Sequence, residues 1–511
     1  MATLTEYVGS LPRWDLLEAP LHISKIFTEA SRFTAFADVL QAAALLFDTS
    51  ECRANAMRHA QTCPGFDQEQ IDRDSRAFAM DPIGTVKALG DEFAHSRVSV
   101  ERLSSLNLDA FPERDIVMNI AGGVDPILPS EFVPILTAAA VRSSNKEIQP
   151  VINALVALCR LKGEVLVIDR VTFIDAVTRL GLPASLAEIG HTYKPDDLLG
   201  RLLYDYKHLR GAIAPNSRSV IPQLQQVYGP LVLPTVPDLY HLFYRLKALF
   251  PGTQLHVGKT DVHRAFQRIR WTPLGSLLLG ILVSEELVAI PIGCGFGHCN
   301  TPYIYGPFSR LFQFLHDQHV QDLRLLSDGD FVSAVVRLGL IYIDDKMMFA
   351  PPDLLKSELT VSCDTIKHVF GLSGVKDSKT VASQCEVLLG ITSDLSREIA
   401  YPCFRSYLKL VHIFFRLIPI DISHNTKLPL CLVQATANLA YRHAVHIPLL
   451  RGSAFQYFAL TKGIPTARQY RRLPVQLSQQ VVDDTLLWRT VLVAAFTDFR
   501  ILQSSLKISH L

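Results

Sequence analysis

The stretch GLIYIDDKMMFAPP, residues 339–352, places two adjacent aspartates between two apolar runs. The first run ends at Ile343 and the second begins at Met347, so the pattern predicts a strand, a tight turn and a second strand. Such a hairpin would hold the carboxylates of Asp344 and Asp345 at its tip. Asp is also a favoured turn residue, and a solvated Asp-Asp turn between two strands needs no function.

The whole chain has the composition of a globular protein. Of its 511 residues, 49% are hydrophobic and 19% are charged, and this length predicts about two to four domains. No uncharged apolar run reaches the roughly 18 residues that a membrane span requires. The N-terminus lacks a basic start followed by an apolar run, so we expect no secretory signal. Nine cysteines without CxxC or Cys/His metal spacing suit reduced thiols, and we expect an intracellular protein, cytoplasmic or nuclear.

Charge is distributed unevenly along the chain. The net charge is +1, but residues 401–511 contain 13 Lys and Arg against 4 Asp and Glu, which gives this segment +9 and leaves −8 for residues 1–400. A segregated basic region is typical of proteins that bind phosphate backbones, although a basic face can also be ordinary solvated surface. The charge pattern alone leaves both interpretations open.

Apolar periodicity divides the chain into three regions. Residues 1–180 have mostly helical patterns and no recognisable chemistry. Residues 185–395 change to short apolar runs separated by turns, and residues 396–511 return to longer helical stretches such as SYLKLVHIFFRLI. We therefore expect boundaries near residues 180–190 and near residues 395–400.

A second acidic position lies in TQLHVGKTDVHRAFQRIRW, residues 253–271. A short strand-like run ends there at Asp261, and VHRAFQRI then has the pattern of a helix start. Asp at a strand-to-helix junction is also a common helix cap. Carboxylates from two strand ends can, however, converge on hard divalent cations, which prefer oxygen ligands. Clustered like charges become tolerable when Mg²⁺ neutralises them, so we expect Asp261, Asp344 and Asp345 to share a site.

These residues and three further motifs resemble the signatures of reverse transcriptases of the retroelement type. YIDD at 342–345 matches the Tyr-x-Asp-Asp signature of this family, and DVHRAF at 261–266 is similar to its first catalytic motif. GFGHCNTP at 295–302 resembles the Phe-Gly-x-x-x-Ala/Ser-Pro element. KPDDLLGRLLYDYKHL resembles the fingers segment, and GVKDSKTVASQCEVLLGI resembles the later palm motifs. All five occur in the order that the family has.

The resemblance implies a catalytic and metal-binding site. The catalytic residues would be Asp261, Asp344 and Asp345, and the same three residues with Val262 would form the metal site. Two Mg²⁺ ions, with Mn²⁺ as an alternative, would stabilise both the attacking and the leaving oxygen of an in-line phosphoryl transfer. In that reaction the 3′-OH of a primer would attack the α-phosphate of a dNTP.

The resemblance also implies a nucleotide site, formed by Lys194, Arg201, Phe266, Phe296, Gly297, Tyr342 and Lys379. Arg and Lys would hold the triphosphate, because Arg forks onto phosphate and Lys acts as a point charge. The ring of Phe266 would exclude a ribose 2′-OH, and a plain core Phe is the alternative. Glycines beside Phe296 would let the backbone approach a ligand closely, and a flexible turn is the alternative. Lys379 would give a proton to the leaving pyrophosphate, with Lys376 as a competitor.

The fold implied by the resemblance is an α+β right-hand polymerase fold, with fingers, a palm built on an antiparallel sheet and a helical thumb. We expect a helical N-terminal region of unknown role at 1–180, fingers and palm at 185–395, and a basic thumb or connection-like region at 396–511. The phosphates of a template-primer duplex, RNA or DNA, would contact Arg405, Lys409, Arg416, Arg468, Arg471 and Arg472. We expect no membrane partner.

Two alternatives remain beside an RNA-directed DNA polymerase. An RNA-dependent RNA polymerase usually has a second Asp five residues after the first and a Gly-Asp-Asp turn, where this chain has Phe266 and Tyr342. A non-catalytic nucleic-acid-binding relic would keep the fold without activity, although the intact set of carboxylates is not typical of decay. Gly295 replaces the proline that usually precedes Phe-Gly, but this change removes no reacting group. The motifs are also similar to those of tyrosine-recombinase (DIRS-like) retrotransposons.

Overall fold

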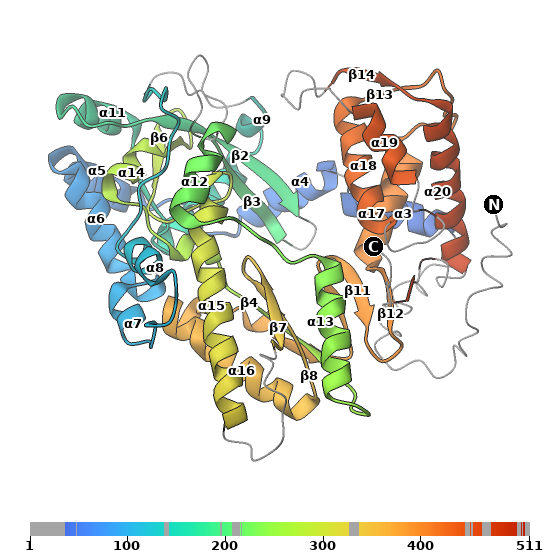
Figure 1. Cartoon of the computed structure of the whole chain (residues 1–511). Coiled ribbons are helices and arrows are strands. Elements are labelled where there is room, and N and C mark those ends of the chain that lie inside the picture. The colour runs from blue at the N-terminus through green and yellow to red at the C-terminus, as the bar shows by residue number, and fades with distance from the viewer. Residues whose placement is uncertain are drawn as a thin grey trace.

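The computed structural model shows a protein of mixed helices and sheets, which agrees with the expected α+β class (Figure 1). The structure describes residues 36–47, 49–136, 143–194, 197–206, 215, 217–325, 337–444, 450, 453–461, 472–497, 502 and 504–505. Among the helices in these ranges, we find none that combines the length and the apolarity needed to cross a membrane.

The predicted hairpin lies at the edge of a four-stranded antiparallel sheet. Across the sheet the strands are β7 (Gly339–Tyr342), β8 (Asp345–Ala350), β4 (His256–Asp261) and β9 (Val381–Ser383). Tyr342 lies opposite Asp345 in the β7–β8 pair, which confirms the prediction of strand, turn and strand. Asp261 lies opposite Asp345 in the β4–β8 pair. Strand register therefore brings the three aspartates to one end of this sheet.

Helices cover both faces of the four-stranded sheet. The helices that precede its first strand or lie between its strands in the sequence are α12 (Ile221–Tyr228), α13 (Val236–Leu249), α14 (Pro273–Leu278), α15 (Asn300–Leu325) and α16 (Pro352–Phe370). Along β8, Met348 and Ala350 pack against α16, whereas Met347 and Phe349 pack on the opposite face with α13. Full burial of such side chains contributes roughly 1.5–3 kcal/mol each, so β8 is fixed from both sides.

Local sequence signals set the ends of these helices. Thr235 and Asp238 form a capping box at the start of α13, with Pro237 in its first turn. α16 begins at Pro352 and ends at Phe370, and the next residue, Gly371, takes a φ of 86° that glycine tolerates well. The hairpin and the helix that follows it are thus defined by residues within their own segments.

A second sheet has five strands and mixed direction. In order they are β1 (Val165–Asp169), β6 (Leu287–Pro291), β5 (Gly280–Leu282), β2 (Leu186–Lys194) and β3 (Asp197–Asp205). β5 and β6 form an antiparallel pair whose connection contains Glu285 and Glu286. β1 pairs with β6, so the boundary expected near residues 180–190 divides one sheet. The expected helical region missed β1 because a run of only five residues, VLVID, lies there between two helical patterns.

The N-terminal helices pack against the sheets and against the C-terminal region. They are α3 (Phe36–Phe47), α4 (Thr49–Ala60), α5 (Gln68–Met80), α6 (Pro82–Glu92), α7 (Val100–Ser104), α8 (Arg114–Ala121), α9 (Ser143–Lys146), α10 (Gln149–Leu161) and α11 (Arg170–Arg179). Val39 and Ala43 of α3 belong to the core of the C-terminal helices. Ala56 and Ala60 of α4 belong to the core beneath the five-stranded sheet. These two successive helices therefore link the C-terminal helices to the part of the molecule that contains the five-stranded sheet (Figure 1).

The C-terminal region combines helices with a small sheet. Its elements are β10 (Cys385–Leu388), β11 (Ile391–Asp394), β12 (Ile399–Pro402), α17 (Phe404–His412), the π-helix η7 (Ile413–Leu417), β13 (Lys427–Pro429), α18 (Leu430–Ala444), α19 (Ser453–Thr461), β14 (Pro474–Gln476), α20 (Gln479–Thr497) and β15 (Ser504–Ser505). In its core, Trp488 stacks on Phe414 with 5.1 Å between ring centroids. β10, β11, β12 and β15 form one sheet, so the boundary expected near residues 395–400 falls inside it.

The stretch VHRAFQRI does not form the expected helix start. Arg264 takes a left-handed φ of 56°, and only the short 3-10 segment η4 (Ala265–Arg268) follows it. A left-handed residue interrupts the helical backbone, so the apolar spacing of this stretch overstated its helicity.

Candidate active site

Three carboxylates meet where β4 ends and the β7–β8 hairpin turns. One oxygen atom from each of Asp261, Asp344 and Asp345 lies within 4.8 Å of the others. Asp261 is 4% exposed, and the other two side chains are partly buried. The structure thus brings together the three aspartates that we expected to share a site, although they come from segments far apart in the sequence.

Burial and mutual repulsion disfavour the charged form of these carboxyls. Burial, together with the charges of Asp261 and Asp345, raises the pKa of Asp344 to about 6. Burial also raises the pKa of Asp345, and Asp261 adds to this effect. The Oδ1 atom of Asp345 is buried and makes no hydrogen bond. Crowded oxygen ligands without enough donors fit divalent cations, so the residues present suit a metal of the Mg²⁺ type.

Lys379 places an ammonium group beside the carboxylates. Its Nζ lies 2.8 Å from Oδ1 of Asp261. Burial lowers the pKa of Lys379, but the hydrogen bond to Asp261 and the neighbouring carboxylates outweigh burial and raise it. Lys376 has an exposed side chain and meets Asp261 through its backbone, where its N–H donates to the Asp261 carbonyl at 3.0 Å. Geometry therefore favours Lys379 over Lys376 as the amine of this site.

The turn that carries Asp344 is strained and is held from two sides. Ile343 has a φ of 56°, which is rare for a β-branched residue and costs of order 1–3 kcal/mol. The hydroxyl of Ser309 donates to the Ile343 carbonyl at 2.7 Å. The backbone N–H of Val262 donates to the Asp344 carbonyl at 3.1 Å. Val262, which we expected at the metal site, thus supports the turn through its backbone.

Phe266 belongs to a cluster of aromatic rings that approaches the carboxylates through Tyr305. Its ring packs edge-on against Phe296 and Tyr305, with centroid distances of 5.2 and 5.7 Å. Tyr305 is buried near Asp344, and burial together with that charge raises the pKa of Tyr305 well above its ordinary value. The guanidinium of Arg201 lies over the Phe296 ring, 5.1 Å from its centroid. A line of contacts therefore runs from Arg201 to the carboxylates.

The glycines of the Gly-Phe-Gly turn are needed for packing on β3. Gly297 has a φ of 107°, and a Cβ atom there would lie 2.3 Å from the carbonyl of Tyr204. A Cβ atom at Gly295 would lie 2.2 Å from the Tyr204 ring. The Tyr204 N–H donates to the Phe296 carbonyl at 3.1 Å. The glycines therefore allow a close approach to a strand, and the turn is held against that strand. The expected approach to a ligand stays a prediction.

Two other residues expected at the nucleotide site lie at strand ends. Tyr342 ends β7 and packs, partly buried, against the core beside α13. Lys194 ends β2 opposite Asp197, but its side chain lies outside the described part of the structure. The nucleotide-binding role of Lys194 stays a prediction.

Helix α15 contributes residues that the sequence motifs did not indicate. Tyr305 and Ser309 follow Thr301 at intervals of four residues, so all three lie on one face of the helix. Thr301, at the small-residue position of the motif, donates to the Gly295 carbonyl at 3.2 Å. The helical spacing was visible in the sequence, but the partner of Ser309 was not, because that partner is a backbone carbonyl of a distant turn.

Three basic residues gather on α17 and α18. Arg405 and Lys409 lie one turn apart on α17, as expected on one helix face. Burial lowers the pKa of Lys409, and Arg442 of α18 and then Arg405 add to the effect. Arg442 was not expected, because no motif includes it. Of the other expected phosphate contacts, Arg416 and Arg472 are exposed, and Arg468 and Arg471 lie outside the described residues.

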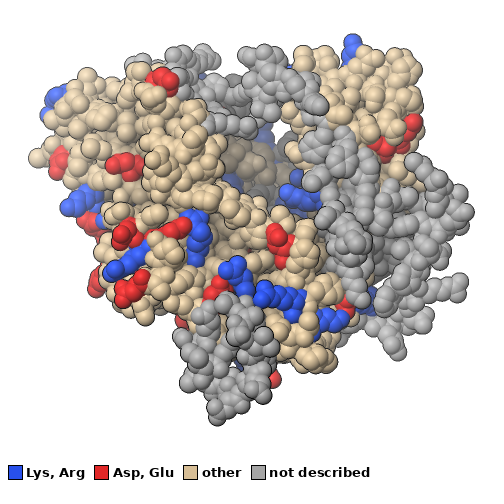
Figure 2. Space-filling model, viewed as in Figure 1, with Lys and Arg blue, Asp and Glu red and all other residues tan. Residues whose placement is uncertain are grey.

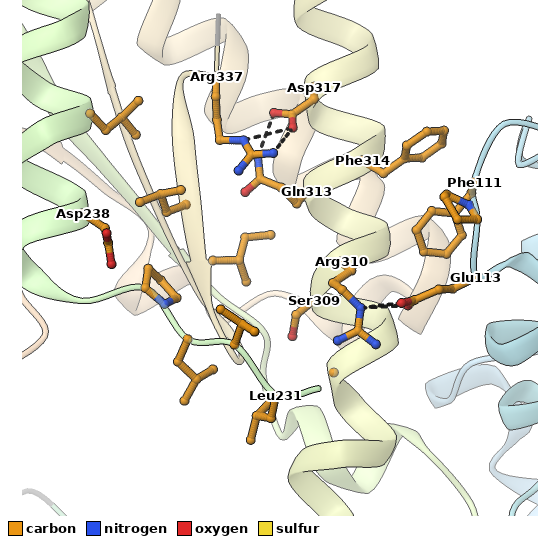
Figure 3. A pocket seen from close by; sticks show the side chains of 18 of the residues that line it. Phe111, Glu113, Leu231, Asp238, Ser309, Arg310, Gln313, Phe314, Asp317 and Arg337 are labelled. Atoms are coloured by element: carbon orange, nitrogen blue, oxygen red, sulfur yellow. Dashed lines mark hydrogen bonds and ion pairs between the residues drawn. The ribbon is translucent and has the colours of Figure 1, made fainter. Parts of the chain in front are cut away.

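A cavity of about 1190 Å³ lies beside β7, the strand that leads into the turn (Figure 3). α13, α15, β7 and the segments 110–113 and 231–234 form its walls, and the lining mixes apolar side chains with polar and charged ones. In one wall, Arg310 donates to the carboxylate of Glu113 at 2.8 Å. Ser309 belongs to the same wall, but none of the three clustered aspartates lines the cavity. The cavity is therefore distinct from the candidate active site.

No family model and no curated protein matches the sequence. Among solved structures, similarity is found to foamy viral protease-reverse transcriptase. Its dRH form in complex with double-stranded DNA has a TM-score of 0.38 and 12% identity, covering 80% of this chain and 60% of that one. The complex with an RNA/DNA hybrid has a TM-score of 0.38 and 12% identity, covering 81% of this chain and 46% of that one. A further complex with double-stranded DNA has a TM-score of 0.35 and 12% identity, covering 80% of this chain and 71% of that one. The chain thus spans less than two thirds of the first two proteins, and such scores decide neither fold nor function.

Proposed function

We propose that the chain is a nucleotidyltransferase of the reverse transcriptase type, which extends a primer with dNTPs on an RNA or DNA template. The observation that carries the proposal is the meeting of Asp261, Asp344 and Asp345 within 4.8 Å at one end of the four-stranded sheet. Carboxylates gathered in this way are the ligands that an in-line phosphoryl transfer with divalent metals requires. The order of the five sequence motifs supports the same activity.

The three aspartates would hold two Mg²⁺ ions, with Mn²⁺ as an alternative. Divalent ions supply charge stabilisation at the attacking and leaving oxygens when they are bound. Asp345 offers a ligand atom without a competing hydrogen bond, since its Oδ1 has no donor. Lys379, held 2.8 Å from Asp261, would hold a proton for the leaving pyrophosphate.

The incoming nucleotide would lie along the contacts from Arg201 to Phe266. The guanidinium of Arg201 stacks on Phe296 and offers planar donors that suit a triphosphate. Phe266 lies between Phe296 and Tyr305 in this line, and the sugar of a dNTP bound to the metals would lie against its ring. A ring at that point excludes a 2′-OH by steric clash, which is the reason to propose selection of deoxyribonucleotides.

The proposal also assigns parts of the molecule to the expected right-hand fold. The five-stranded sheet would belong to the fingers, the four-stranded sheet to the palm and the C-terminal helices to the thumb. Figure 2 shows a hollow between the C-terminal helices and the rest of the molecule, with Lys or Arg side chains at its edge. A template-primer duplex in this hollow would meet the basic residues of α17 and α18. The motif resemblance supports a retrotransposon origin, of the DIRS-like type.

Primer extension tests the proposal. The purified protein receives a primed RNA template, Mg²⁺ and either dNTPs or NTPs, and we expect extension with dNTPs that stops when EDTA removes the metal. Extension with NTPs alone would replace the proposal with an RNA-dependent RNA polymerase. Binding of the primed template without extension on either RNA or DNA would indicate a non-catalytic relic.

A further inference from the structure

Two arginines hold the short segment that carries Phe266. At the end of η4, Arg268 is buried, with an exposed fraction of 5%. Its guanidinium donates to the carbonyl of His263 at 2.9 Å and to the carbonyl of Ser96 at 2.7 Å. These bonds fix the C-terminal end of η4 to the protein interior.

At the other end of η4, Arg264 makes an ion pair with the N-terminal region. Its Nη2 lies 2.7 Å from Oε2 of Glu164, and the two side chains are only 24% and 9% exposed. The same Nη2 lies 3.8 Å from the sulfur of Cys159. Because Arg264 has the left-handed φ of 56°, the ion pair stabilises a backbone conformation that an arginine seldom adopts.

Glu164 is itself fixed by the backbone around it. Its N–H donates to the Cys159 carbonyl at 2.9 Å, and its carbonyl accepts the N–H of Ile292 at 2.8 Å. Burial raises the pKa of Glu164, and among the nearby cations Arg264 opposes this effect most strongly. The carboxylate is therefore a rigid anchor whose main cationic partner is Arg264.

The ion pair and Phe266 are both linked to the same residue of β3, Tyr204, the ion pair through its charges and Phe266 through Phe296. Glu164 and Arg264 both lie close enough to Tyr204 to act electrostatically on its hydroxyl, whose pKa burial raises well above the ordinary value. The Tyr204 N–H holds the Phe296 carbonyl, and the Phe296 ring packs on Phe266. A shift of Arg264 would therefore disturb both the backbone that carries Phe266 and the ring beside it.

We propose that the ion pair between Glu164 and Arg264 positions Phe266 against the sugar of the incoming nucleotide, so that the N-terminal region contributes to the selection of deoxyribonucleotides. This inference rests on the proposed polymerase function and adds a specificity role for a segment in which the sequence showed no chemistry. Glu164 and Arg264 act through Phe266, so they are positioning residues.

Nucleotide selectivity in charge-removing variants tests the inference. Glu164→Gln keeps the shape of the side chain and removes its charge, and Arg264→Gln removes the other charge. We expect either variant to lower the ratio of kcat/KM for dNTP to that for rNTP by roughly tenfold, within the range for residues in contact. The double variant should lose no more than one single variant, because both changes remove the same interaction. Arg264→Lys keeps the charge and should retain part of the selectivity.

Asp74→Asn is a matched control for a lost buried ion pair. Arg160 and Asp74 lie 2.8 Å apart and are 18% and 14% exposed, but their pair joins α10 to α5, not to η4. We expect Asp74→Asn to lower the melting temperature without changing the selectivity ratio.

The outcomes separate this inference from the proposed function. Absence of dNTP extension by the unmodified protein overturns the function. Selective extension that Phe266→Val weakens, but that Glu164→Gln and both Arg264 variants leave unchanged, overturns only the inference. An equal loss of selectivity in Asp74→Asn overturns it as well, because the effect would then be general loosening. If Glu164→Gln fails to fold, the comparison of Arg264→Lys with Arg264→Gln decides the same question.

Discussion

Asp344 lies in a strained turn between two strands, beside two other carboxylates. Its substitution tests the role of its charge. Asp344→Asn keeps the size of the side chain and removes the charge that a metal ligand needs. We expect primer extension to fall at least about a hundredfold, the scale for losing one electrostatic stabiliser in an active site. Single-turnover extension measures this loss, and fluorescence anisotropy should show nearly unchanged duplex binding.

The control for Asp344→Asn uses a second Asp-Asp pair of the chain. Asp483 on α20 is exposed and accepts a hydrogen bond from Gln479 at 2.9 Å. Asp483→Asn should leave extension unchanged, because Asp483 is an exposed residue on the surface of α20. Normal turnover in Asp344→Asn would remove the residue from the reaction.

Phe266 is the residue whose shape should decide between sugars. Phe266→Val shortens a half-buried ring that contacts Phe296 and Tyr305, so it opens space where a 2′-OH would lie. We expect rNTPs to compete better with dNTPs, measured as the ratio of kcat/KM values. A folded variant with unchanged preference would assign Phe266 to packing alone.

At the scale of elements, the segment after the Gly-Phe-Gly turn predicts a dependence of stability on pH. His298 is 4% exposed between Tyr206 and Trp271, and burial lowers its pKa to about 3. Between pH of about 6.5 and 3 the unfolded chain binds one more proton at this residue than the folded chain does. The contribution of His298 to the free energy of unfolding therefore falls as the pH falls through this window.

Urea unfolding at pH 7.0 and pH 5.5 measures this effect. Between pH 7.0 and pH 5.5, the free energy of unfolding of the unmodified protein should fall by about 1 kcal/mol more than that of His298→Gln. The reason is that each bound proton changes this free energy by about 1.4 kcal/mol per pH unit below the pKa of the unfolded chain. His424→Gln, which changes an exposed histidine, should behave like the unmodified protein. Equal losses in the unmodified protein and His298→Gln would mean that His298 does not stay neutral in the fold.

Elements defined by local patterns were predictable from the sequence, and their distant partners were not. The two apolar runs on either side of Asp344-Asp345 predicted the β7–β8 hairpin, and a short strand-like run predicted the strand that ends at Asp261. The partners Ser309 and Glu164 carry no local signal, because each acts on a segment far away in the chain. The meeting of Asp261 with Asp344 came from family resemblance and the chemistry of carboxylates, which periodicity alone does not supply.

At the scale of the whole molecule, the N-terminal helices do not form a region of their own but pack into two different cores. α3 packs into the C-terminal core, where Phe36 contacts Phe415 at 5.2 Å between ring centroids, and α4 packs beneath the five-stranded sheet. The sequence indicated helices there but not their partners, since an apolar helix face does not specify which core it joins. The C-terminal region is thus attached through α3 as well as through the chain that leads from β12 into α17.

The charge asymmetry of the chain, visible as +9 in residues 401–511, leads to a prediction about duplex binding. Arg405, Lys409 and Arg442 form a cluster on α17 and α18. Burial lowers the pKa of Lys409, and the two arginines lie close enough to lower it further. If these residues contact phosphates, their joint replacement by Gln should weaken binding to duplexes of every sequence. The slope of log affinity against log salt should become shallower by about 0.9 for each lost contact on B-form DNA.

A matched triple variant distinguishes local phosphate contacts from the loss of overall charge. Arg73 and Arg76 on α5 and Lys87 on α6 are exposed, and their replacement by Gln removes the same three positive charges. Titrations of a labelled duplex over a range of salt concentrations should give an unchanged slope for this control, because charges beyond a Debye length of about 10 Å are screened. The KM for dNTP at saturating primer should stay constant in both triple variants, since neither touches the carboxylate site. Equal slopes in the two variants would mean that α17 and α18 do not form the duplex-binding face.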